Sequence, residues 1–94
     1  MTTPTVAVII PAYNVADYIV RAVESALTQT VPPQEIIVID DASIDATADR
    51  VQAMRYPHVR VITNRFNRGP SASRNLGFRV ARSDWVALLD ADYG

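Results

Sequence analysis

The sequence contains no cysteine and no lysine, and it has a single histidine. Without cysteine the chain can form neither a disulfide nor a thiolate metal site, and one histidine cannot build a multi-histidine site. Any metal must therefore be bound by carboxylates. The absence of lysine excludes a P-loop lysine and a Schiff-base lysine.

Long apolar runs are also missing. The longest run of β-branched and small apolar residues, 6–10, is far shorter than the roughly 20 residues that a membrane span needs, and the first residues lack the features of a signal peptide. We expect a cytoplasmic chain. A membrane association of a longer parent protein would leave no trace in these residues.

What is present is the composition of one folded domain of 94 residues, 49% apolar and with a net charge of −1. The charge is unevenly distributed: residues 1–49 sum to −6, residues 50–82 hold eight arginines and no acid, and the last residues sum to −3. This pattern suits a polyanionic ligand that brings a divalent cation, although a solvated arginine-rich helix face would also explain it. Aromatic residues do not alternate with the arginines, so we expect no nucleic-acid partner.

The hydrophobic pattern alternates between two periods. Short β-branched or apolar runs predict strands, and apolar residues spaced by three and four predict helices between them. The predicted strands are 6–10, 35–39, 59–62 and 85–89, and the predicted helices follow residues 14, 43 and 69. The order βαβαβαβ predicts an α/β fold with three layers and a mainly parallel sheet.

Several local details also follow from the sequence. We expect Pro11 to end the first strand, because proline cannot donate to a β-ladder. Ser43 is predicted to cap the second helix, with Ile44 on its inner face. The run 85–89 has the composition of a strand buried on both faces.

Ligands of such sheets bind at the carboxyl ends of the strands. The first strand-to-helix turn has no glycine, which argues against a dinucleotide fingerprint. Asp90 and Asp92 follow the last strand, where two carboxylates can bind Mg²⁺ or Mn²⁺ or serve a plain turn. Asp40 and Asp41 follow the second strand, where they can bind a ligand or only cap and contact solvent. Tyr13 can stack on a base or fill a gap beneath a helix.

Five ordered runs give the sequence a family resemblance. They are VAVIIPAYN (6–14), ALTQT (26–30), EIIVIDDASIDAT (35–47), NRGPSASRNLG (67–77) and WVALLDAD (85–92). Together they resemble the amino-terminal half of a family 2 inverting glycosyltransferase. The resemblance implies a GT-A, Rossmann-like fold, a nucleotide-diphosphate sugar as donor, usually UDP-linked, and a divalent cation, Mn²⁺ or Mg²⁺. Residues 1–94 would be the nucleotide-sugar-binding part, with the acceptor-binding half missing.

The resemblance also implies roles for individual residues. The first-strand motif, which ends at Asn14, would lie against the base and ribose, with Tyr13 stacking on the base. Asp41 would accept a hydrogen bond from the base, with Asp40 as its structural neighbour, and Arg74 would line the donor pocket. Asp90 and Asp92 would form the D-x-D motif that binds metal and ribose. The full set of implied donor-site residues is Pro11, Ala12, Tyr13, Asn14, Asp40, Asp41, Arg74, Asn75, Asp90, Ala91 and Asp92. Tyr93 stands where many relatives have a third acid.

In this family the general base lies well downstream, in the acceptor-binding half. We therefore assign no catalytic residue to this chain and expect it to bind its donor without turnover. The acceptor stays unknown. We also expect self-association through the exposed edge of the fourth strand, because an unpaired apolar edge is a template for another chain.

Two other functions fit parts of the sequence. IVIDDAS and VALLDADYG resemble the acid-bearing strands of a response-regulator receiver domain, with Asp90 as phospho-acceptor, although a strand and a helix precede the acid pair here. A stand-alone nucleotide-binding module would have the same architecture. A mass increase of one phosphoryl group after incubation with a small phosphodonor would indicate the receiver domain. A downstream pair of acids in the natural reading frame would indicate a transferase and not a stand-alone nucleotide-binding module.

Overall fold

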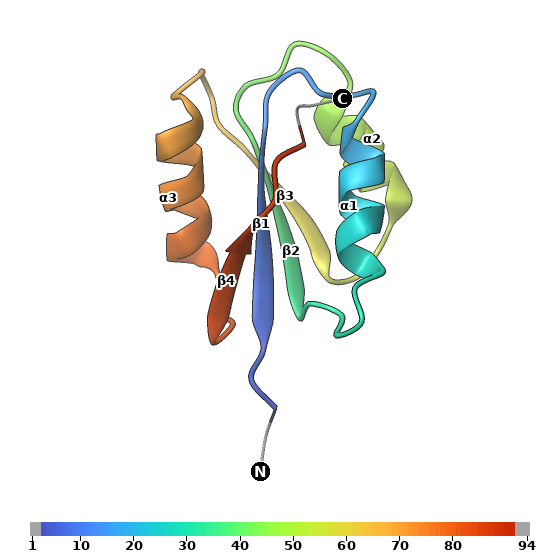
Figure 1. Cartoon of the computed structure of the whole chain (residues 1–94). Helices are drawn as coiled ribbons and strands as arrows, with labels where there is room; N and C mark the ends of the chain where they lie inside the picture. The colour runs from blue at the N-terminus through green and yellow to red at the C-terminus, as the bar shows by residue number, and fades with distance from the viewer. Residues whose placement is uncertain (1–2, 92–94) are drawn as a thin grey trace.

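The computed structural model describes residues 3–91, which form alternating strands and helices (Figure 1). The elements in chain order are β1 (Val6–Ala12), α1 (Ile19–Leu27), β2 (Glu35–Asp40), α2 (Thr47–Met54), β3 (Val59–Thr63), α3 (Pro70–Val80) and β4 (Trp85–Leu88). The predicted order is therefore confirmed, with shifts of one or two residues at the ends of strands.

The sheet has the strand order β3-β2-β1-β4, and each neighbouring pair is parallel. The order reverses between β1 and β4, because the chain first moves outward from β1 through β2 to β3 and then crosses back to place β4 on the other side of β1. In an open parallel sheet, ligands bind at the carboxyl ends of the strands near such a reversal. Tyr13 directly follows β1, and Asp90 lies two residues beyond the end of β4.

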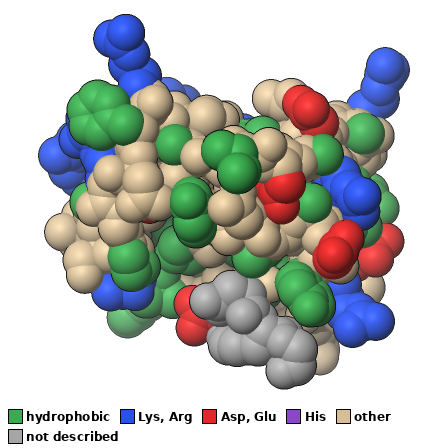
Figure 2. All heavy atoms as spheres, turned by 90° about the horizontal axis from the view of Figure 1, so that it is seen from above, with side chains coloured by type: hydrophobic (Ala, Val, Ile, Leu, Met, Phe, Trp, Pro, Cys, Tyr) green, Lys and Arg blue, Asp and Glu red, His purple; other side chains and the backbone are tan. Residues whose placement is uncertain are grey.

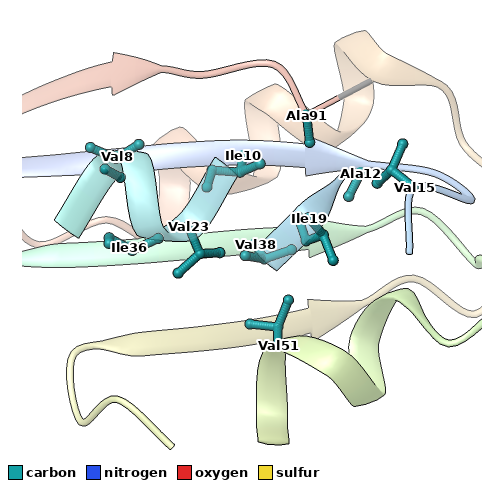
Figure 3. Packing of buried hydrophobic residues seen from close by; sticks show 11 residues of the cluster. Val8, Ile10, Ala12, Val15, Ile19, Val23, Ile36, Val38, Val51 and Ala91 are labelled. Carbon is teal, nitrogen blue, oxygen red and sulfur yellow. The ribbon is translucent and has the colours of Figure 1, made fainter. Parts of the chain in front are cut away.

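Helices cover both faces of the sheet, as the α/β prediction requires (Figure 1). Successive side chains of a strand point to opposite faces. Val8, Ile10 and Val38 therefore pack with α1 and α2 on one face (Figure 3), whereas Ile9 and Ile37 pack beneath α3 on the other. The two clusters make β1 and β2 the buried centre of the fold.

A glycine lets α3 approach β1 closely. Gly77 is buried, and a Cβ atom at this position would collide with the side chain of Ile9. The close packing fixes the height of α3 on the sheet and with it the place of its amino-terminal end.

Pro11 does not end the first strand, contrary to the sequence prediction. The carbonyl of Ile9 accepts from the backbone N–H of Leu89, so odd-numbered residues of β1 face β4, whose register with β1 ends at Ile9. At position 11 a backbone N–H would point toward β4 beyond the last paired residue. Proline therefore loses no hydrogen bond of the sheet there, and β1 continues to Ala12.

The predicted start of the second helix is also wrong. Helix α2 begins at Thr47, Ile44 is 90% exposed, and the Ser43 hydroxyl accepts a hydrogen bond from the backbone N–H of Asn14 instead of capping the helix. Asp45 does the capping from outside the helix, because its carboxylate accepts from the N–H of Thr47 (3.0 Å). The segment between β2 and α2 is thus a loop, and it is hydrogen-bonded to the loop that follows β1.

The fourth strand is not buried on both faces. All four residues of β4 are exposed, and Trp85 reaches 65%. The reason is that the helices pack mainly over β1, β2 and β3, and neither hydrophobic cluster includes a residue of β4, which lies at the edge of the sheet beside β1.

Within residues 3–91, no helix is both long enough and apolar enough to cross a membrane.

Candidate functional site

A cavity of about 260 Å³ opens at the carboxyl-terminal edge of the sheet, which Figure 2 views from above. We call it the edge cavity. Its walls come from the end of β1, the residue after β2, the loop before α3, the start of α3 and the second residue after β4. The lining residues are Pro11, Ala12, Tyr13, Asp41, Asn67, Gly69, Pro70, Ser73, Arg74 and Asp90.

Asp41 is the most firmly held polar side chain of the cavity. It is only 4% exposed, and its Oδ1 atom accepts from the side-chain amide of Asn64 (2.9 Å) and the backbone N–H of Arg68 (2.8 Å). Its Oδ2 atom accepts from the backbone N–H of Gly69 (2.9 Å). The carboxylate therefore fixes the 64–69 loop against β2.

The same contacts set the charge state of this side chain. Burial by itself raises the pKa of Asp41, but hydrogen bonds from Arg68, Asn64 and Gly69, with the positive charge of Arg68, outweigh it and leave the pKa below its ordinary value. Asp41 is thus an anion at neutral pH, held at the wall of the cavity.

Asn64 connects this network to α3. Its side-chain amide also donates to the hydroxyl of Ser73 (3.3 Å), a fully buried residue of α3. Asn64, Asp41 and Ser73 therefore hold three segments together behind the cavity. Neither Asn64, in the loop after β3, nor Ser73, on α3, was predicted from the sequence as a site residue, since a single polar residue gives no local signal of the contacts it makes.

A second set of hydrogen bonds joins the loops that follow β1 and β2. The side-chain oxygen of Asn14 accepts from the N–H of Ile44 (2.9 Å), and the N–H groups of Val15 and Ala16 donate to Thr47 and Asp45. Asn14 adopts a left-handed φ of 53°, which asparagine tolerates well. The two loops are held as one unit, which positions Tyr13.

Asp45 takes part in this unit as an anion. Burial raises its pKa, but hydrogen bonds from Thr47 and Ala16 dominate and lower it overall.

The open side of the cavity carries an aromatic ring and a positive charge. Tyr13 is 49% exposed, so its ring is available to a ligand. Arg74 lies in the first turns of α3, whose amino-terminal end at Gly69 and Pro70 also lines the cavity. A helix amino terminus and a guanidinium both favour a negatively charged group.

Asp90 is the described half of the predicted metal motif. It is exposed and lines the cavity. Residues 3–91 contain no group of three or more potential metal ligands. Asp92 and Tyr93 lie outside the described residues. One exposed carboxylate suits a Mg²⁺ or Mn²⁺ ion that takes much of its coordination from water and from a substrate phosphate.

The structure brings some of the predicted site residues together and separates others. Pro11, Ala12, Tyr13, Asp41, Arg74 and Asp90 line the cavity. Asn14 links two loops, and Asp40 is buried and accepts from the N–H of Ser43 (3.0 Å). Asn75 lines a different concavity, and Ala91 is buried in the core cluster below α1.

The cavity also contains residues that the prediction did not select, namely Asn67, Gly69, Pro70 and Ser73. All belong to the run 67–77, one of the five that carry the family resemblance. The run itself was the available signal, but it did not indicate which of its side chains face the cavity.

Comparison with known proteins agrees with this fold and site. Residues 7–93 match the model of glycosyl transferase family 2. The chain is 49% identical to succinoglycan biosynthesis protein ExoO of Rhizobium meliloti (strain 1021), over 95% of this chain and 26% of ExoO. It is 39% identical to the Escherichia coli glucosyltransferase WfaP, named as acting on an α-D-GlcNAc-diphosphoundecaprenol, over 93% of this chain and 35% of WfaP.

Solved structures give the same result. S. aureus TarS in complex with UDP-GlcNAc superposes with a TM-score of 0.85 at 31% identity, over 94% of this chain and 26% of that one. The Pyrobaculum calidifontis mannosyltransferase PcManGT, in complex with GDP-Man and Mn²⁺, gives 0.85 at 30% identity, over 98% of this chain and 28% of that one.

These 94 residues thus span about a quarter to a third of the length of those relatives. The resemblance inferred from the five runs is confirmed, and the match favours a transferase over the receiver-type switch. The chain belongs to glycosyl transferase family 2 and has the fold of the amino-terminal part of GT-A glycosyltransferases.

Proposed function

We propose that the edge cavity binds a nucleoside-diphosphate sugar, with UDP as the nucleotide, together with a divalent cation. The observation that carries the proposal is the convergence of Tyr13, Asp41, Arg74 and Asp90 on one cavity. Two structural neighbours at about 30% identity are complexes with UDP-GlcNAc and with GDP-Man and Mn²⁺, which supports this class of ligand.

Each side chain has a distinct part in the proposal. The exposed ring of Tyr13 stacks on the base. Asp41, held as an anion, accepts a hydrogen bond from the base. Arg74 and the amino-terminal end of α3 attract the diphosphate.

Asp90 and Asp92 are the proposed ligands of the cation, Mn²⁺ or Mg²⁺. When bound, such an ion neutralises charge that develops on a diphosphate leaving group. Asp90, Arg74 and the helix end together hold the donor so that its anomeric carbon is open to the acceptor.

For the whole protein we propose transfer of the sugar to an acceptor hydroxyl with inversion at the anomeric carbon. Inversion follows when a base deprotonates the acceptor on the side opposite the leaving diphosphate. We propose no base within residues 1–94 and expect this chain by itself to bind the donor without turning it over. A coupled assay of UDP release from UDP-sugars and a panel of acceptors tests this, and steady turnover would contradict it.

The donor site is tested by titration calorimetry of UDP with and without Mn²⁺. Tyr13→Ala and Asp92→Ala should abolish or strongly weaken the metal-dependent binding. Tyr56→Ala and Asp49→Ala are matched controls, because Tyr56 is similarly exposed and neither residue lines the cavity. Equal affinity in all four variants, or binding that ignores Mn²⁺, would contradict the proposed site.

We further propose that two copies of this chain associate through β4. Trp85, Val86 and Leu88 are exposed apolar side chains on a strand at the edge of the sheet. Pairing two such edges would satisfy backbone groups and cover these side chains. Light scattering at micromolar concentration should give twice the chain mass, and Val86→Lys should restore the mass of one chain; a single-chain mass for the unaltered protein would refute this.

A further inference from the structure

A second concavity, of about 440 Å³, lies between α3 and the loop that follows β3. Three arginines line it, Arg65, Arg68 and Arg79, and we call it the arginine groove. The other lining residues are Thr63, Asn64, Ala72, Asn75 and Leu76. It shares no lining residue with the edge cavity.

The groove has two ordered walls. On α3 the lining positions 72, 75, 76 and 79 follow the three-and-four spacing of one helix face. The opposite wall is the loop that Asp41 anchors through the backbone of Arg68 and the side chain of Asn64. The Arg68 guanidinium lies over the ring of Phe66, 5.0 Å from its centroid, which restricts this long side chain.

Among residues 3–91, no acid lines the groove. In the part of the chain that the structure describes, the one ion pair joins Arg60 to Glu35, outside the groove. The carboxylate of Asp41 lies behind the loop and is occupied by the loop's own N–H groups. Figure 2 likewise shows arginine side chains at the rim of the molecule on the α3 side. Three positive charges in one concavity repel each other, and a bound anion would relieve this repulsion.

We propose that the arginine groove binds a phosphate-bearing anion, separately from the donor site. Guanidinium groups match phosphate oxygens with paired N–H donors, and the neutral side chains of Thr63 and Asn75 offer further hydrogen bonds. The walls are held before the ligand arrives, so little ordering is needed on binding. The phosphate can belong to a free small molecule or to a lipid headgroup.

The test is a titration of the ¹⁵N-labelled chain with pyrophosphate in the presence of EDTA, followed by backbone and arginine side-chain NMR signals. Signals of residues 63–79 should shift. The double variant Arg65→Gln/Arg79→Gln should weaken binding by about tenfold or more, because it removes two charge-assisted contacts. The control Arg21→Gln/Arg55→Gln removes the same charge from α1 and the end of α2 and should leave the affinity unchanged.

Two results of the pyrophosphate titration would overturn the proposal. One is equal weakening in both double variants, which would mean attraction by overall charge. The other is binding that is lost in Arg74→Gln and unaffected by Arg65→Gln/Arg79→Gln, which would place the anion in the edge cavity.

Flotation with phosphatidylcholine vesicles, with and without phosphatidylglycerol, then separates the two sources of the phosphate. Loss of flotation specific to Arg65→Gln/Arg79→Gln would assign a lipid headgroup, whereas pyrophosphate binding without flotation would assign a free anion. Binding to neither probe refutes the proposal.

Discussion

Replacing Asn64 by alanine would test whether the network around Asp41 holds the candidate site together. The side chain of Asn64 is nine-tenths buried and donates to Asp41 and Ser73. A hydrogen bond to a charged group contributes about 1.5–3 kcal/mol, and a neutral one about 0.5–1.5 kcal/mol. Because Asn64→Ala removes both contacts and leaves two buried partners short of a donor, we expect the free energy of unfolding to fall by about 2–4 kcal/mol.

The loss should depend on pH in a defined direction. The pKa of Asp41 is lower in the folded chain than its ordinary value of 3.8. Its stabilisation is therefore complete above the unfolded pKa and is lost as the pH falls through the folded pKa. The effect of Asn64→Ala should be largest near pH 7 and smaller near pH 3, because it is lost as the pH falls through the folded pKa of Asp41.

Urea unfolding followed by circular dichroism at both pH values measures these differences. Asn75→Ala is the matched control, because Asn75 is exposed on α3 and its side chain makes no hydrogen bond to the described residues. It should change stability by no more than about 0.5 kcal/mol. The reasoning would be refuted by a loss below about 0.5 kcal/mol in Asn64→Ala, or by an equal loss at pH 7 and pH 3.

Three further substitutions test other parts of the structure. Gly77→Ala should destabilise the chain by about 1–3 kcal/mol in a thermal melt, because the added methyl group collides with Ile9; an unchanged melting temperature would show that α3 can move away from β1. Glu35→Gln should lower stability by about 1 kcal/mol at pH 7. Burial raises the pKa of Glu35, but hydrogen bonds from Ser83 and Arg82 and the charge of Arg60 outweigh it and lower the pKa overall. The difference in stability between Glu35→Gln and the unaltered chain should therefore be lost as the pH falls through the folded pKa. A difference that persists at pH 2 would show that it does not come from the charge of Glu35. Asp45→Ala should cost about 1–2 kcal/mol in urea unfolding and weaken UDP binding, because Asp45 caps α2 and ties it to the Tyr13 loop; loss of neither would show that the loops hold without it.

The candidate site shows where a sequence motif stops being informative. Arg74 and Asn75 belong to one run, yet Arg74 lines the edge cavity and Asn75 the arginine groove. Neighbouring residues on a helix point about 100° apart, so a motif on α3 necessarily serves two surfaces. Which surface each residue faces depends on how the helix is rotated against the sheet, and here Gly77 and its packing on Ile9 set that rotation.

The last strand shows a second limit. The run 85–89 reads as a strand buried on both faces, but β4 is exposed at the edge of the sheet. An apolar run indicates a strand and does not indicate its place in the strand order. The arginine block behaves similarly: its charge was evident from the sequence, whereas the concavity that gathers three of its eight members depends on the path of the 64–69 loop.

The sequence by itself determined the alternation of strands and helices, the parallel sheet and the strand ends at which the site lies, because hydrophobic periodicity and turn residues are local properties. Only the tertiary structure decided that Asp41 is held by Asn64, Arg68 and Gly69, residues 23 to 28 positions away in the chain. Such contacts form only when β3 has paired with β2 and the 64–69 loop folds over the end of β2, and no local pattern encodes which donors this loop places beside a carboxylate.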